Sequence, residues 1–274
     1  MDVFPRVFLL VFCQFAVGGL FCLSIAPFHE IARGYYKSSA FVYVLIGALA
    51  LAGRVALWWN APEANGWIVV EIVLWALFVA AAGLYLASLW SELMVLRARL
   101  FATAALSGLA ALVVMAEGYR QAPLLSLETV LFPVSFVLSA LLLGAAASGM
   151  LLGHWYLIDR DLSLRPLEQT AAMYMRLLIA QAGLLLATLA LLGAFGAPEM
   201  RAAVADLLGN HPTLLAARIA VSPFGAGVLA WMIRKTLDVP QTMAATGLFY
   251  IAVLTVMVGE LLGRFLLFRS GLPL

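Results

Sequence analysis

The chain has 274 residues, of which 65% are hydrophobic and 11% are charged, and its mean hydropathy is +1.06. Soluble domains carry about 25% charged residues, so this composition excludes a chain that covers itself with a water-facing surface. The net charge of +2 does not indicate a nucleic-acid partner. Lipid is therefore the expected solvent, and the long, continuous apolar runs favour helices over a β-barrel. The sequence predicts an all-α polytopic membrane protein, with residues 1–274 in one transmembrane domain.

The apolar runs, taken in chain order, predict a bundle of about eight transmembrane helices, because a span needs about 20 apolar residues. The predicted spans are about 5–27, 39–59, 67–91, 101–118, 128–158, 170–195, 213–233 and 242–268. The longest connection, 196–212, ends in Asn210-His211-Pro212, which predicts a helix start at Thr213. Ser222-Pro223-Phe224-Gly225 predicts an interruption of the seventh span.

Lysine and arginine are unevenly distributed between the two sets of connections. The connections after spans one, three, five and seven hold Arg33, Lys37, Arg97, Arg99, Arg160, Arg165, Arg234 and Lys235. The opposite set holds Arg6, Arg120, Arg201 and Arg269. Cytoplasmic loops carry the excess of basic residues, so both termini are predicted on the outer side, the periplasm if the host membrane is a bacterial inner membrane. Trp58, Trp59 and Trp67 would then lie at the outer interface.

Six charged side chains fall within or at the ends of spans, and all are predicted in the outer half of the membrane: Arg54, Glu71, Glu117, Arg218, Glu260 and Arg264. A charge at the bilayer centre costs about 2.5–3.5 kcal/mol even on the gentler scales, so such groups pair inside the bundle or serve function. Glu260 and Arg264 are four residues apart and can pair, and Gly259 and Gly263 allow a neighbouring helix to come close. The set indicates either structural ion pairs or a polar cavity for an amphiphile such as a quinone, whose oxygens need hydrogen-bond donors.

A second polar cluster is predicted at the inner end of the bundle, from His154, Tyr156, Asp159 and Arg176. His154 is compatible with a haem ligand, a quinone contact or an interfacial anchor. Haem b in a helix bundle usually needs two axial ligands at matching depth, and the only other inner-side histidine, His29, lies in a loop, so haem is disfavoured. No spacing of His, Cys and carboxylates indicates a metal site, and no glycine-rich phosphate loop indicates ATP-driven transport.

Six short stretches in chain order carry a family resemblance: residues 8–20 with Gln14, Glu71-Ile72, Tyr119, Phe132-Pro133, Ala217-Arg218-Ile219, and Gly259-Glu260-Leu261-Leu262-Gly263-Arg264. They resemble the membrane-anchor subunit of dimethyl sulfoxide reductase-type complexes, and more distantly the anchors of polysulfide and nitrite reductases. The last stretch is the most similar. One departure is that the family's histidine after the second helix is missing, and Leu57-Trp58-Trp59-Asn60 stand in its place.

The resemblance implies a quinone-interacting anchor that is not catalytic alone and carries no metal. It implies quinol oxidation near the outer face, with electrons passed to an iron–sulfur or cytochrome subunit and a separate molybdenum-type catalytic chain. The candidate quinone-binding residues are Glu71, Arg218, Glu260, Arg264, Arg54, Glu117 and Asn60. Two alternatives remain: a structural subunit without a working quinone site, which the missing histidine favours, and a small secondary transporter or lipid-handling protein, which the interrupted seventh span favours.

Overall fold

The computed structural model describes residues 3–60, 66–120, 125–159 and 161–274. Two parts of the predictions lie outside the described residues: the connection at 61–65, and Arg160 of the basic connection after the fifth span. Within the described part the chain is helical, without strands, in this order: α1 (Val3–Cys22), η1 (Leu23–Ile25), α2 (Arg33–Asn60), α3 (Gly66–Ser88), α4 (Met94–Glu117), α5 (Glu128–Ile158), α6 (Arg165–Phe195), α7 (Pro198–Asn210), α8 (Pro212–Ile219), η2 (Ala220–Ala226), α9 (Gly227–Leu237) and α10 (Thr242–Ser270).

Eight helices in the described residues are long and apolar enough to cross a membrane, which confirms the predicted all-α polytopic fold. The fifth span, 128–158, begins and ends where the sequence predicts. The second and sixth begin earlier than predicted, at Arg33 and Arg165, because helices continue past the apolar segment that hydropathy detects. The seventh span is the run of α8, η2 and α9, and η2 is a π-helical stretch at the predicted interruption around Pro223.

The predicted 196–212 connection contains a helix, α7, that the sequence reading missed. Its Met200, Val204 and Leu207 are buried on one face, at the spacing of successive helical turns. They pack with a small apolar cluster that includes Leu192 and Leu215. The following helix starts at Pro212 rather than Thr213, since proline is well suited to the first helical turn.

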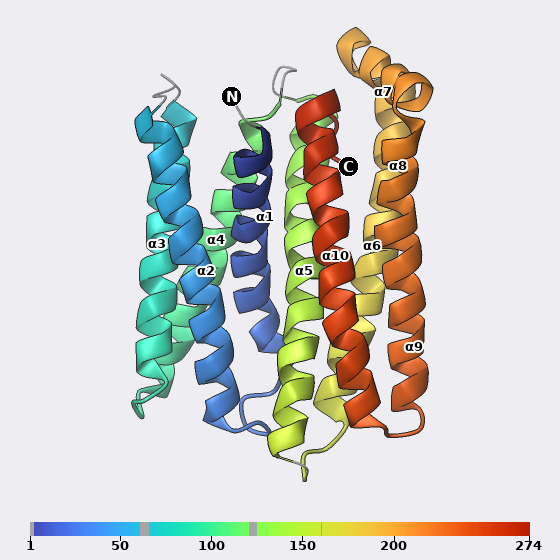
Figure 1. Ribbon diagram of the computed structural model, residues 1–274. Helices are drawn as coiled ribbons and strands as arrows, with labels where there is room; N and C mark the ends of the chain where they lie inside the picture. Colours follow the sequence, from blue (N-terminus) through green and yellow to red (C-terminus); the bar gives the residue numbers. More distant parts are fainter. Residues whose placement is uncertain (1–2, 61–65, 121–124, 160) are drawn as a thin grey trace.

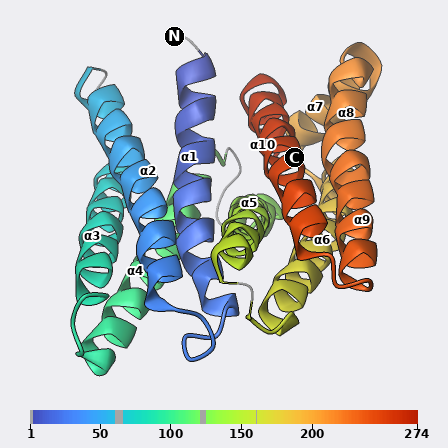
Figure 2. The ribbon, with the colours of Figure 1, turned by 60° about the horizontal axis from the view of Figure 1, so that its bottom comes forward.

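Helices α1 and α5 form the centre of the bundle, with α2, α3 and α4 on one side and α6, α8, α9 and α10 on the other (Figures 1 and 2). The backbones of α1 and α5 come very close to each other: a Cβ at Gly18 of α1 would overlap the Ala140 carbonyl of α5, and one at Gly144 of α5 would overlap the Gly18 backbone. Small residues allow this close approach in membrane bundles, where apolar side chains gain little by leaving lipid.

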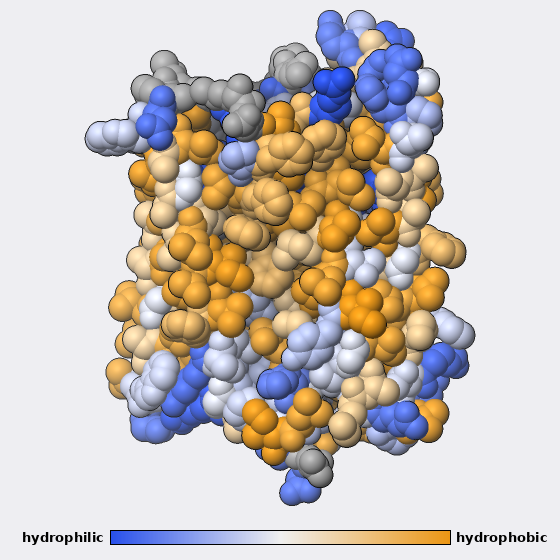
Figure 3. Space-filling view, in the orientation of Figure 1, coloured by the Kyte–Doolittle hydropathy of each residue, from blue (hydrophilic) through white to orange (hydrophobic). Residues whose placement is uncertain are grey.

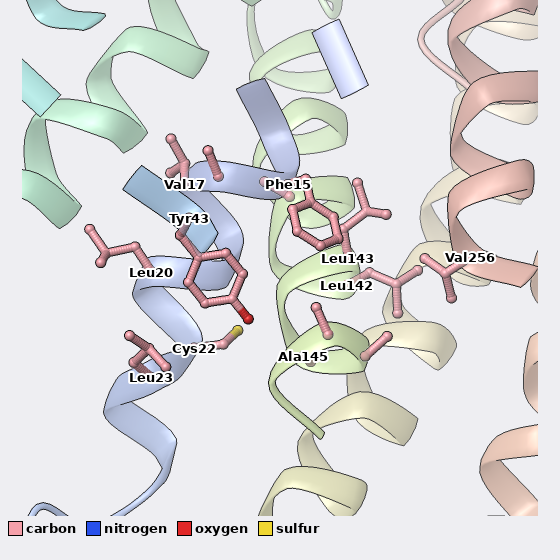
Figure 4. Packing of buried hydrophobic residues seen from close by; sticks show 14 of the residues in the cluster. Phe15, Val17, Leu20, Cys22, Leu23, Tyr43, Leu142, Leu143, Ala145 and Val256 are labelled. Carbon is pink, nitrogen blue, oxygen red and sulfur yellow. The ribbon is translucent and has the colours of Figure 1, made fainter. Parts of the chain in front are cut away.

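Buried aromatic and aliphatic side chains fill the space beside the α1–α5 contact (Figure 4). Tyr43 of α2 lies between Phe15 and Cys22, and its hydroxyl is 3.2 Å from Ser148 Oγ. On the face seen in Figure 3 the middle of the surface is mostly hydrophobic, and hydrophilic residues gather at the two ends. This surface pattern is the one that a bilayer requires, and the chain is a multi-pass membrane protein.

Candidate functional site

An ion pair joins the end of α2 to the beginning of α3. Arg54 donates from Nε to Glu71 Oε1 at 2.8 Å and from Nη2 to Glu71 Oε2 at 2.6 Å. The Glu71 side chain is 5% exposed and that of Arg54 19% exposed. Two parallel charge-assisted hydrogen bonds fix both side chains in one orientation. The pair is therefore a fixed, directional group at the end of the bundle that carries the N-terminus.

A cavity of about 340 Å³ opens beside this ion pair. Its size falls in the range of small-molecule sites, about 300–1,000 Å³. Polar groups from Arg6, Arg54, Glu71 and Tyr119 line it together with apolar side chains, among them Trp58, Trp67, Met115 and Phe268. These residues come from or adjoin α1, α2, α3, α4 and α10. The cavity thus combines charged and aromatic side chains at the predicted level of the membrane interface.

Tyr119 is the one phenol that lines this cavity among the described residues. Its ring packs at 5.8 Å from that of Phe136 and edge-on at 5.4 Å from that of Phe268. Desolvation by this packing raises the pKa of Tyr119 to about 12. The phenol therefore keeps its proton at physiological pH and can donate a hydrogen bond to a carbonyl oxygen in the cavity.

A second group of charges is buried deeper, between α8 and α10. Arg218 Nη2 donates to Glu260 Oε1 at 2.9 Å, and Arg264 Nη2 lies 3.5 Å from Glu260 Oε2. All three side chains are 0% exposed. Arg264 also donates to Ser139 Oγ of α5 at 2.5 Å, and its guanidinium lies 4.6 Å from the centre of the Phe136 ring. Phe136 thus contacts both Arg264 of the buried group and Tyr119 of the cavity.

Gly259 and Gly263 explain how α10 accepts these charges. A Cβ at Gly259 would lie 3.1 Å from Arg218 Nη1 and 2.6 Å from Ser222 Cβ, and one at Gly263 would lie 2.9 Å from Arg218 Nε. The neighbouring helix comes close, as expected from the two glycines. The Arg218 guanidinium fills the space that they leave.

The structure separates the seven candidate quinone-binding residues into different places. Arg54 and Glu71 line the cavity, whereas Arg218, Glu260 and Arg264 form the buried group. Glu117 pairs with Arg120 at 2.6 Å. Asn60 donates to the Ala56 carbonyl of its own helix at 2.9 Å and is not among the cavity residues. The i, i+4 pairing of Glu260 and Arg264 is confirmed.

The predicted inner cluster is wrong as a cluster, because its members turn to different partners. His154 is exposed and lies 3.3 Å from the Tyr250 hydroxyl. Tyr156 donates to the Ser163 carbonyl, and Arg176 donates to the Ala172 carbonyl at 3.2 Å. Asp159 directly follows the last residue of α5, Ile158. They do not form one site, because Arg176 stands 11 residues into α6, about 16 Å along its axis, whereas the other three lie at or just after the end of α5.

Sequence reasoning did not assign Arg6, Met115 or Phe268 to a site, and it placed Trp58 and Trp67 only at the interface. One sequence feature could have pointed to the cavity: aromatic residues gather at those ends of the spans that the lysine and arginine distribution places on the outer side of the membrane. Among the described residues no three His, Cys, Asp or Glu side chains come together as a metal site.

Fold and cavity together define a multi-pass α-helical membrane protein with an amphiphile-sized pocket at one end of the bundle. Comparison with protein-family models gives no match, and a search of curated proteins gives none either.

Proposed function

We propose that this chain is the quinone-interacting membrane anchor of a multi-subunit respiratory oxidoreductase. In this role it passes electrons between the quinone pool and a docked iron–sulfur or cytochrome subunit. The observation that carries the proposal is the cavity at the Arg54–Glu71 pair. A quinone headgroup is flat and apolar on its faces and has two oxygens at its ends, and the cavity offers aromatic walls with polar groups at fixed positions.

The residues present fit such a headgroup. Tyr119 keeps its proton, so it is suited to donate a hydrogen bond to one oxygen. Arg54 is oriented by its two bonds to Glu71 and lines the cavity with it, which supplies a cation and a carboxylate at the other end. A quinol releases two electrons and two protons on oxidation. Glu71 is the carboxylate in the cavity that is suited to receive a proton from a bound ligand.

The site would lie on the outer side of a bacterial inner membrane, with both chain termini on the periplasmic side. The support for this orientation is the excess of lysine and arginine in the connections at the opposite end of the bundle. A redox partner would then dock at the end that carries the cavity and α7. Docking there shortens the path for electrons that leave the quinone.

The test is purification of the chain from its native membrane, followed by quinol-dependent reduction of the purified complex. An iron–sulfur or cytochrome subunit is expected to co-purify. Glu71→Gln should lower quinol-dependent reduction about 100-fold, as loss of a proton acceptor does, with the complex still assembled. Glu168→Gln removes an exposed carboxylate at the opposite end of the bundle, so quinol-dependent reduction should stay unchanged.

Two outcomes would refute the proposal. Purified complex without any redox subunit would exclude an anchor of this kind. The second is that Glu71→Gln prevents assembly of most of the complex, while the fraction that does assemble reduces at the wild-type rate with quinol. Glu71 would then have a structural role, and the chain would be a subunit without a quinone site.

A further inference from the structure

A second groove, of about 330 Å³, lies at the other end of the bundle, where the chain turns from α9 into α10 (Figure 1). Its lining residues come from the end of α9, the connection and the first turn of α10: Trp231, Met232, Lys235, Thr236, Val239, Gln241 and Ala244. The backbone of the turn holds this groove open. The N–H groups of Val239 and Gln241 both donate to the Thr236 carbonyl, at 3.3 Å and 3.2 Å. The groove is therefore a fixed feature of the α9–α10 turn.

The groove combines a basic side chain with exposed apolar ones. Trp231 and Lys235 stand four residues apart on α9, so they lie on the same side of the helix, one turn from each other. Trp231 is 58% exposed and Val239 is 63% exposed. Indole rings prefer the interface between hydrocarbon and headgroups, and a lysine stem reaches outward from that level with its charge in the headgroup region. The two side chains thus match the two parts of a phospholipid.

Lys235 and Gln241 have donors to offer to a ligand. The Lys235 ammonium has three N–H donors, and Asp238 accepts from it at 3.1 Å. The two side chains are 62% and 54% exposed, so this ion pair is weak. Within the part of the chain that the structure describes, Gln241 makes no side-chain hydrogen bond to the start of α10, so its amide can donate as well. The Thr236 hydroxyl, in contrast, donates to the Met232 carbonyl at 2.8 Å.

The charge of the turn favours an anion. Arg234 and Lys235 stand against Asp238 alone, and the turn belongs to the end of the bundle that holds the excess of lysine and arginine. Anionic lipids of the cytoplasmic leaflet are attracted to such basic residues. A soluble phosphate would use the ammonium but leave Trp231 and Val239 without a partner. A phospholipid engages both kinds of side chain.

We propose that the groove between α9 and α10 binds an anionic phospholipid from the leaflet at that end of the bundle. The lipid phosphodiester accepts hydrogen bonds from Lys235 Nζ and Gln241 Nε2, and an acyl chain packs against Trp231. A phosphatidylcholine carries the same phosphate but adds a quaternary ammonium, which Arg234 and Lys235 repel. This site is distant from the cavity at the Arg54–Glu71 pair, and it does not depend on the function proposed for that cavity.

The test is quenching of tryptophan fluorescence by brominated lipids in phosphatidylcholine nanodiscs. The probe is phosphatidylglycerol with bromine on its acyl chains near the headgroup, and phosphatidylcholine brominated in the same way is the reference. The chain has seven tryptophans, so Trp231→Phe identifies the part of the quenching that belongs to Trp231. Half of this part should be reached at an about fivefold lower mole fraction of phosphatidylglycerol than of phosphatidylcholine, since one basic side chain is worth about that factor at an anionic surface.

Two variants and a competitor make the assignment specific. Lys235→Gln removes an exposed ammonium without disturbing the packing, so the preference of Trp231 for phosphatidylglycerol should disappear. Lys37→Gln is the matched control, because Lys37 lies at the same end of the bundle, 4.5 Å from the Trp90 ring and outside the groove. It should keep the wild-type preference. Soluble glycerol phosphate, which has the headgroup but no acyl chain, should not reduce the quenching.

Equal quenching of Trp231 by the two brominated lipids would overturn the proposal. An equal loss of preference in Lys37→Gln and Lys235→Gln would do so too, because it would assign the effect to the general surface charge. Displacement of the lipid by glycerol phosphate would show that the groove binds a soluble anion instead.

Discussion

Glu260→Gln is the substitution that tests the buried charge group most severely. The Glu260 carboxylate contacts Arg218 Nη2 at 2.9 Å and Arg264 Nη2 at 3.5 Å, and none of the three side chains is exposed to solvent. Glutamine keeps the shape but removes the charge, so two buried guanidinium groups lose their common counterion. Removing one partner of a buried pair costs about 3–5 kcal/mol in the free energy of unfolding. For a protein of this size that loss corresponds to a fall in Tm of about 10 °C.

The assay is thermal unfolding in detergent, followed by tryptophan fluorescence. Glu117→Gln is the matched control, because its pair with Arg120 spans a single helical turn and both side chains are partly exposed, at 19% and 14%. A pair of that kind is worth about 1 kcal/mol or less. The double variant Glu260→Gln/Arg218→Met returns the net charge of the group to its original value and should recover about half of the loss. A fall in Tm for Glu260→Gln no larger than for Glu117→Gln would refute the electrostatic reasoning.

Further substitutions test the packing and the cavity. Gly18→Val should prevent the close contact of α1 with α5 and abolish the monodisperse peak in size-exclusion chromatography, since a Cβ there overlaps a carbonyl. Gly183→Ala, with no atom within 4 Å of the added Cβ, should give wild-type yield and a Tm at least as high. Tyr119 has a folded-state pKa of about 12, above the unfolded value of about 10, so the unfolded chain loses its proton first. Its contribution to stability is complete below pH 10 and is lost between about pH 10 and 12, and Tyr119→Phe should make Tm fall less steeply in that range; an identical pH profile would contradict this. Cys13 and Cys22, 0% and 1% exposed, should react with N-ethylmaleimide only after denaturation, and rapid labelling of folded protein would contradict the packing of α1.

The sequence predicted the spans well because the bilayer imposes one strong requirement on every helix. Each run must be long and apolar, and this requirement can be read without knowledge of the partners. The eight spans and the pairing of Glu260 with Arg264 within one helix turn are confirmed. The helix α7 was missed because it lies outside the apolar runs, although Met200, Val204 and Leu207 already show the spacing of a buried helical face.

The arrangement of the charges around the bundle could not be predicted in the same way. Position along a span gives the depth of a side chain but not the direction in which it points. Arg218 and Glu260, 42 residues apart, were expected at similar depth, and only the packing of α8 on α10 brings them together. His154 and Arg176 were expected in one inner cluster, but both are exposed and contact other residues.

The contact between the cavity residues and the buried charges likewise runs through a side chain that carries no charge. Phe136 lies between Tyr119 and Arg264, and nothing in its sequence context distinguishes it from other aromatic residues of the spans. The large groups that complete the cavity come from helix ends distant in the chain, such as Trp58 and Phe268. A cavity of this kind becomes visible only when the helices are packed.

Photochemical labelling with an azidoquinone tests the central claim most directly. The protein in lipid nanodiscs would be irradiated with the probe, digested, and mapped by mass spectrometry. A quinone site at the Arg54–Glu71 cavity predicts adducts on peptides that contain Trp58, Trp67 or Tyr119. Excess unlabelled quinone should suppress these adducts, and Glu71→Gln should weaken them. Adducts confined to the opposite end of the bundle, or adducts that unlabelled quinone does not compete away, would contradict a quinone site in this cavity.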